Sequence, residues 1–336
     1  LVVCRRAGIR VYVVGNVAPF GREKATMDWT MEDGEKLQLD YDAGPETVLP
    51  ESLNIGLWGN RPVNLGQLSS GYGPYALTRL CKETGGLYYV AQEDSNVKFS
   101  PAVMRNYPPD YRPIVDYQKS LVANKAKNSL VTAAKATKIE NIPLPRLDFP
   151  AYNDNVLRET ITESQKPAAE LIFKINRVAD ALASGEKDRE KLAEPRWRAA
   201  YDLAIGRALA MRVRSDGYNQ MLAEMKGTPR PFQKKDSNEW RITPSKAINA
   251  GAAIKKDEKR AVTYLKRVMD EHPGTPWAYI AELELSTAMG WEWQENKNPA
   301  LFAANTTPAE AQRQIRLREI CPSSSRQFWV PPWSNR

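Results

Sequence analysis

The chain has 336 residues, of which 42% are hydrophobic and 26% are charged, a composition that supports a packed core and excludes disorder throughout. No run of 18 apolar residues occurs, so the sequence contains no transmembrane helix. One histidine and three widely spaced cysteines, without a C-x-x-C pair, exclude a histidine metal cluster and a zinc or thioredoxin-like site. The formal net charge is +8, and the length favours two or three domains.

The first fifteen residues predict the end of a helix followed by a strand. Residues 1–7 have helical character, and Gly8 interrupts them. The β-branched run 9–15 then predicts a strand that ends in glycine.

Residues 16–70 are predicted to form a long insertion that contains a β-hairpin. Polarity alternates on both sides of the Asp33-Gly34 turn signal, which predicts a hairpin over 26–41. Another short strand is expected at 54–58. Ligand loops gather at the carboxyl ends of the strands in open α/β sheets. The insertion is therefore the best candidate for a binding surface in the first domain.

Residues 69–90 predict a loop, an amphipathic helix, a glycine turn and a strand. Four residues share one helical face: Ala76, Leu77, Leu80 and Cys81. The helix stops at Gly85-Gly86, because glycine adopts the left-handed conformation without a steric cost. The apolar run 87–90 follows as a buried strand.

The helix, Thr84-Gly85-Gly86 and strand 87–90 together resemble the last helix and strand of a von Willebrand factor type A (VWA) domain. The run 9–15 resembles the penultimate strand of the same fold. The resemblance covers residues 1–92 and implies the C-terminal part of a Rossmann-like α/β sheet, interrupted by the β-rich insertion.

The metal-ion-dependent adhesion site of that family starts with Asp-x-Ser-x-Ser, and no such motif occurs in this sequence. The resemblance therefore carries over no metal ligand, and we expect no cofactor in this chain; a divalent metal would belong to an adhesion site upstream. Two explanations stay open. The chain is the C-terminal portion of a longer protein, or its domain is degenerate and never had the site.

The rest of the chain is predicted to be mainly helical. A proline-rich linker is expected at 93–115, a helical domain at 116–293, and an extended tail with one short helix at 294–336. The expected helices span 116–137, 157–183, 195–225, 257–271 and 275–289. Residues 226–245 are expected to form a loop, with a helix from Pro244 into Gly251.

Two helical segments, 197–210 and 261–285, resemble tetratricopeptide helical hairpins. Their period is irregular, so an unrelated helical bundle is the alternative. The charge of this half is also open to two interpretations. Residues after 100 carry a net +10, which suits an anionic partner such as nucleic acid, while interleaved acids suit an ordinary solvated helix surface.

The cysteines and the histidine are expected to be structural. Cys4 and Cys81 lie on apolar helix faces, where they serve as core residues or form a disulfide. Cys321 lies far from both. His272 ends a helix, where it can bond the last carbonyl groups. We therefore expect no catalytic residue in this chain.

Aromatic residues are the remaining candidates for a binding surface, with packing between helices as the alternative. The candidates are Trp29, Trp58, Tyr72, Trp277, Trp291 and Trp293. The sequence favours a non-enzymatic protein-binding or scaffolding protein with protein partners, as a homo- or hetero-oligomer. The alternatives are an enzyme whose active residues lie upstream and a binder of nucleic acid or another anionic polymer. The compartment stays open.

Overall fold

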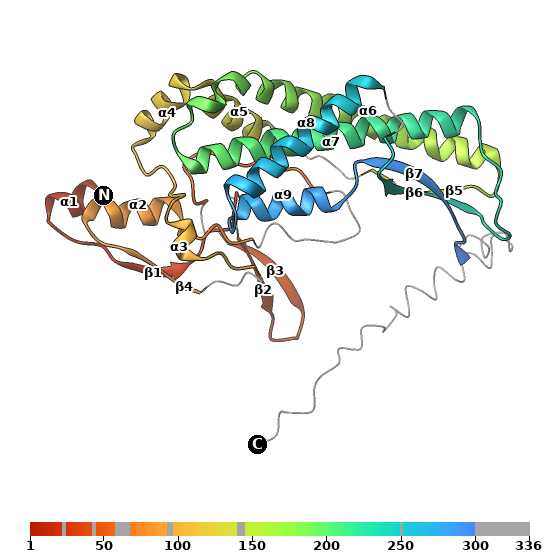
Figure 1. Ribbon diagram of the computed structural model, residues 1–336. Coiled ribbons are helices and arrows are strands. Elements are labelled where there is room, and N and C mark those ends of the chain that lie inside the picture. The colour runs from red at the N-terminus through yellow and green to blue at the C-terminus, as the bar shows by residue number, and fades with distance from the viewer. Residues whose placement is uncertain are drawn as a thin grey trace. The chain divides into compact units, whose positions relative to one another are not determined.

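A computed structural model describes residues 1–21, 25–41, 45–57, 68–92, 97–139, 145–248 and 251–299 (Figure 1). The chain divides into two compact units. The first contains residues 1–145, 164–223 and 244–292, and the second contains residues 146–163, 224–243 and 293–336. The expected linker at 93–115 therefore belongs to the first unit. Its helix α3 (Pro101–Met104) precedes Tyr107, and both Met104 and Tyr107 are buried.

The first ninety residues form a mixed α/β arrangement. Helix α1 (Val2–Arg6) ends before Gly8, which has a φ of +64°, and strand β1 (Val13–Asn16) follows. Helix α2 (Tyr75–Thr84) ends at Gly85, which has a φ of +76°, and leads to strand β4 (Tyr88–Gln92). Strands β1 and β4 pair in parallel, with α2 on the connection between them. The predicted helix, glycine stop and strand are confirmed, but the expected burial of the strand is wrong, because Leu87, Tyr89 and Val90 are exposed in the two-stranded sheet.

The predicted hairpin is also confirmed. Strand β2 (Ala25–Thr30) pairs antiparallel with β3 (Lys36–Tyr41), and Gly34 in the turn has a φ of +87°.

The strand expected at 54–58 is wrong for its described residues, 54–57. The backbone carbonyls of Ile55 and Gly56 accept hydrogen bonds from Arg207, at 2.7 and 3.2 Å, in place of a neighbouring strand. Trp58 lies outside the described residues.

The helical part contains two helices where one was expected. Helices α4 (Ile114–Ala123) and α5 (Lys125–Ile139) are separated by Asn124, whose backbone is extended. The side-chain oxygen of Asn124 accepts hydrogen bonds from the backbone N–H groups of Ala126 and Lys127, so it caps the second helix.

The long helices agree better with the sequence. Helix α6 (Asp154–Ala183), the 3₁₀ turn η2 (Glu186–Lys191) and helix α7 (Pro195–Gly227) follow in order. Helix α8 (Ala252–Glu271) starts five residues before its predicted position and packs against α9 (Pro276–Ser286). None of the described helices is long and apolar enough to cross a membrane.

A three-stranded sheet, ordered β5-β6-β7, was not predicted. It contains β5 (Asp148–Pro150), β6 (Glu239–Ser245) and β7 (Gly290–Asn296). The loop expected at 226–245 and the helix expected from Pro244 are therefore wrong over β6. Aromatic side chains hold the three strands together in the second unit. The rings of Phe149 on β5 and Trp240 on β6 lie 5.3 and 6.3 Å from the ring of Trp293 on β7.

Candidate functional site

One face of the β1–β4 sheet is apolar and open. The register pairs Val14 with Tyr89, and Tyr12 and Leu87 lie two residues before them on the same face. The exposed fractions of Tyr12, Val14, Leu87 and Tyr89 are 54%, 71%, 58% and 50%. We call these four residues the outer sheet face. Parallel sheets are normally covered on both faces, so an uncovered apolar face is a candidate contact surface.

The other side of the same sheet is packed around the Tyr88 ring. The Tyr88 hydroxyl donates a hydrogen bond to the backbone oxygen of Asn16 at 2.7 Å. A Cβ atom at Gly15 would lie 2.5 Å from the Tyr88 hydroxyl, and one at Gly73 would lie 2.3 Å from the Tyr88 ring, so Tyr88 packs closely against both glycines. Cys81 of α2 is buried. Val90, paired with Gly15 on this side, is still 45% exposed, so the outer sheet face holds the larger share of the exposed apolar residues but not all of them.

A buried group of charges joins the insertion to helix α7. The Arg196 guanidinium donates hydrogen bonds to Glu51 at 2.8 Å and to Glu46 at 3.2 Å. The Tyr117 hydroxyl donates to the other Glu51 oxygen at 2.8 Å. All four side chains are buried. We call Glu46, Glu51, Tyr117 and Arg196 the Arg196 cluster; it holds two carboxyl groups against one cation.

The structure brings two of the six candidate aromatic residues to this cluster. The Arg196 guanidinium lies 5.1 Å from the centre of the Trp277 ring, and burial raises the pKa of Tyr72, which lies in the field of Arg196, to about 12. The Tyr72 hydroxyl donates to the backbone oxygen of Met104. Trp277 is fully buried against Phe20. Trp277 is therefore a core residue in this structure.

The other candidates are dispersed. Trp29 is exposed on the β2–β3 hairpin. Trp291 is buried, and its indole N–H donates to the backbone oxygen of Arg214 at 2.8 Å. Trp293 is half-buried in the second unit. The six residues do not form one aromatic surface among those that the structure describes.

The pKa of the Glu46 carboxyl is shifted because the side chain is buried. Burial raises the pKa of its carboxyl above the ordinary value of 4.5, with Arg196 opposing the shift. One of its oxygens, Oε2, is buried without a hydrogen-bond partner in the described structure.

Glu46→Gln is therefore expected to flatten the pH dependence of stability. A raised pKa in the folded state means that the folded state binds the proton more tightly. This contribution is complete below pH 4.5 and is lost as the pH rises through the raised pKa. Urea unfolding of both proteins between about pH 4 and pH 9 measures the effect. The variant should equal or exceed the natural protein in stability at high pH, and a variant that is less stable there would contradict the assignment.

A second buried group carries the opposite charge. Glu284 of α9 accepts hydrogen bonds from Arg207, at 3.0 Å, and from Arg214 of the same helix α7. Arg214 also donates to the backbone oxygens of Glu284 and Thr287, at 3.0 and 2.9 Å. Burial opposes ionisation of Glu284, but the two guanidinium groups outweigh it, and the pKa of the carboxyl lies below its ordinary value.

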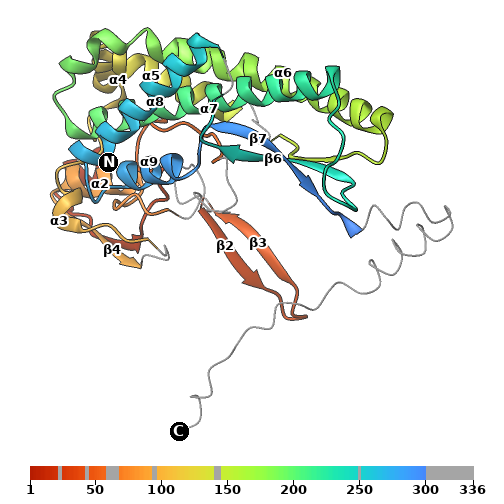
Figure 2. The same cartoon turned by 45° about the vertical axis from the view of Figure 1, so that its right-hand side comes forward.

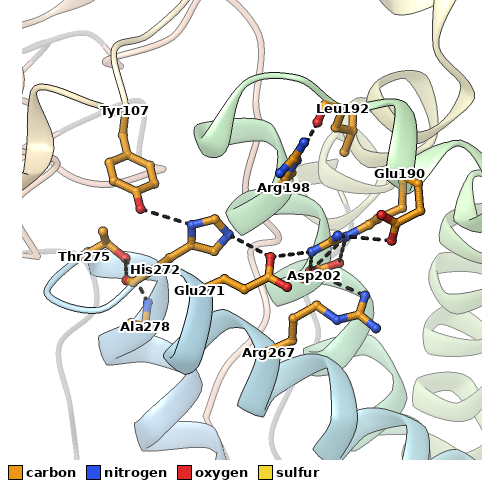
Figure 3. A network of polar contacts seen from close by, with 11 residues as sticks. Tyr107, Glu190, Leu192, Arg198, Asp202, Arg267, Glu271, His272, Thr275 and Ala278 are labelled. Carbon is orange, nitrogen blue, oxygen red and sulfur yellow. Dashed lines mark hydrogen bonds and ion pairs between the residues drawn. The ribbon is translucent and has the colours of Figure 1, made fainter.

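A third network includes the only histidine (Figure 3). Arg189 donates to Asp202 at 2.6 Å and to Glu271 at 2.9 Å. His272 Nδ1 lies 3.1 Å from the Tyr107 hydroxyl, and its Nε2 lies 4.0 Å from Glu271, too far for a hydrogen bond. Burial lowers the pKa of His272, so the imidazole is neutral at pH 7 and fills a structural position.

An open hollow of about 550 Å³ lies at the start of α7. It is lined by Lys82, Glu83, Pro108, Pro109, Asp110, Tyr111, Arg112, Glu194 and Trp197. Most of its charges are already paired: Arg112 with Asp110, and Glu194 with Lys127, the latter pair at 2.9 Å. Convergent unpaired acids or bases, which an active site needs, are absent from the described lining.

The described residues offer little for catalysis or metal binding. No three His, Cys, Asp or Glu side chains in this part of the chain come together in a way that could hold a metal ion. Cys4 and Cys81 are free thiols, and burial raises the pKa of Cys81, which keeps it protonated. Cys321 lies outside the described residues.

Sequence reasoning missed the buried arginines and the outer sheet face. Arg196, Arg207 and Arg214 lie 11 and 7 residues apart, which places them on one side of α7. This spacing along one side of the helix is the sequence signal from which the buried arginines could be recognised. No sequence signal distinguishes the outer sheet face, because strands that are buried on both faces have equally apolar sequences.

Comparisons with known proteins add no relative. No family model, no curated protein and no solved structure matches this chain.

Proposed function

We propose that this is a non-enzymatic binding protein whose partner is a polypeptide that covers the outer sheet face. The exposure of Tyr12, Val14, Leu87 and Tyr89 on one side of a parallel sheet carries the proposal. Contiguous exposed apolar residues often mark contact surfaces. Those of this sheet also lie next to strand edges that are unpaired in the described structure.

We also infer that β1, α2 and β4 are the end of a VWA-like domain. The parallel pairing, the helical connection and the left-handed Gly85 support this. Further strands of that domain are then one form that the covering polypeptide can take. The tetratricopeptide interpretation of α8 and α9 stays a prediction; it rests on two packed helices joined by a short turn.

Val14→Asp is expected to weaken binding by at least about tenfold. Burying a valine side chain contributes roughly 1.5–3 kcal/mol, and a carboxylate in its place must also lose its hydration. Quantitative affinity purification of the tagged protein from its source cells measures the change. Polypeptides bound to the outer sheet face should be depleted in the variant.

Val122→Asp provides the matched control, because Val122 on α4 is 85% exposed and lies far from β1 in sequence. It should retain the whole set of co-purifying polypeptides. If both variants retain the same set as the natural protein, the outer sheet face is not the binding surface. Circular dichroism should show equal folding of all three proteins, since both valines are exposed.

A further inference from the structure

The register and the sequence of the β2–β3 hairpin predict one apolar and one polar face. The register pairs position 25 with 41, 27 with 39 and 29 with 37, and alternation puts these positions on one side of the ribbon. The sequence has Ala, Met, Trp, Leu, Leu and Tyr at these six positions. The six alternate positions hold only Thr, Asp, Lys and Gln. This alternation is typical of a hairpin that has one face covered.

Of these six positions, the structure describes the side chains of Trp29 and Leu37, and both are exposed. Among the described strands, β2 and β3 pair only with each other, and Met31 is also exposed. Figures 1 and 2 both show the hairpin extending away from α9, a helix of the same unit. A two-stranded hairpin is marginally stable alone in water, so an occupant of its apolar face would also stabilise it.

The charge of the hairpin indicates which charge a partner of its apolar face should carry. Residues 25–41 contain five acidic residues and one lysine, a formal charge of −4. Since the whole chain carries +8, the remaining residues carry +12. An anionic membrane or nucleic acid would repel the hairpin, whereas a basic polypeptide surface would attract it.

Helix α8 presents such a surface. Lys255, Lys259 and Lys266 are exposed along one side of it, at i, i+4 and i+11, with Ala252 and Val262 in the same row. None of the three lysines forms an ion pair with a carboxylate in the described part of the chain. We call Lys255, Lys259 and Lys266 the α8 lysine row. Its aliphatic stems can pack against apolar side chains, and its ammonium groups can lie over an indole ring.

We propose that the hairpin of one molecule binds the α8 lysine row of a second copy of this chain. Trp29 and Leu37 lie against the lysine stems and Val262, and the acidic turn faces the ammonium groups. The contact joins two different surfaces, so two such contacts, related by a twofold axis, close a dimer. This interface is separate from the outer sheet face.

Sedimentation of the full chain at about 50 mM and about 500 mM salt tests the proposal. We expect a dimer at low salt and at least tenfold weaker association at high salt, because exposed charges are screened within a few ångströms. Trp29→Ser should abolish the dimer at both salt concentrations by removing its apolar contact.

A charge exchange identifies the two surfaces. Glu32→Lys with Glu35→Lys, or Lys255→Glu with Lys259→Glu, should each weaken association at least tenfold at low salt. All four changes together should restore it to within about threefold. Lys135→Glu, an exposed site on α5, is the control and should leave the dimer intact.

Three results would overturn the proposal. The first is a monomer at low salt and micromolar concentration. The second is a dimer that survives both half-exchanges, and the third is a failure of the four changes together to restore it. If Val14→Asp dissociates the dimer while the charge-exchange variants leave it intact, self-association belongs to the outer sheet face. That result overturns this inference and leaves the proposed function standing.

Discussion

Arg196→Met is expected to lower the free energy of unfolding by about 3–5 kcal/mol. Removing one partner of a buried ion pair leaves an uncompensated buried charge, and here a single guanidinium serves both Glu46 and Glu51. Methionine preserves much of the side-chain volume, so the loss reports the guanidinium with its ion pairs and its cation–π contact with Trp277 rather than a cavity. Urea unfolding at pH 7 measures it.

Arg105→Met is the matched control for this change. Arg105 is exposed at the end of α3, and surface substitutions of this kind usually shift stability by less than about 0.5 kcal/mol. A loss below about 1 kcal/mol for Arg196→Met would show that the Arg196 cluster does not hold the insertion on α7.

Glu284→Gln is expected to cost about 3 kcal/mol or more at neutral pH. The change leaves two guanidinium groups, of Arg207 and Arg214, buried without a counter-charge. Glu282→Gln on the same helix is the control, because that side chain is exposed and should tolerate the change. Equal stability of the two variants would contradict the buried pairing.

The pH dependence of the Glu284 contribution has the opposite sign to that of Glu46. Its pKa is lowered in the folded state, so its contribution is complete above the ordinary pKa of 4.5. The contribution is lost as the pH falls through the lowered value. The difference in stability between the natural protein and Glu284→Gln should therefore shrink in acid, as thermal unfolding at about pH 3 and pH 7 can show.

The elements with local signals were predictable from the sequence. Gly8, Gly34 and Gly85 all have positive φ values, and each ends or turns the element that the sequence assigned to it. The long helices α6 and α7 follow from their apolar periodicity. These features depend on interactions within a few residues of the chain.

The three-stranded sheet could not be predicted in the same way. Strand β5 contains Pro150, which reads as a break, and its pairing with β6 joins residues about ninety positions apart. The buried arginines were hidden for a related reason. Apolar periodicity treats a charged residue as exposed, and only the distant Glu46, Glu51 and Glu284 reveal that Arg196, Arg207 and Arg214 are internal.

The candidate site was predictable only in part. Trp29 lies on an exposed hairpin within the insertion that the sequence favoured. Trp277 and Trp291 fill the core, because an aromatic ring at helical spacing looks the same whether it contacts a partner or a neighbouring helix.

Site-specific photo-crosslinking from position 14 tests the outer sheet face most directly. A photoreactive amino acid replaces Val14 in one protein and Val122 in another, both expressed in the source cells and irradiated. The account predicts a crosslink from position 14 to a polypeptide segment outside residues 1–336, on another chain or upstream in the same one, and none from position 122. No crosslink from position 14, or equal crosslinks from both positions, would contradict it.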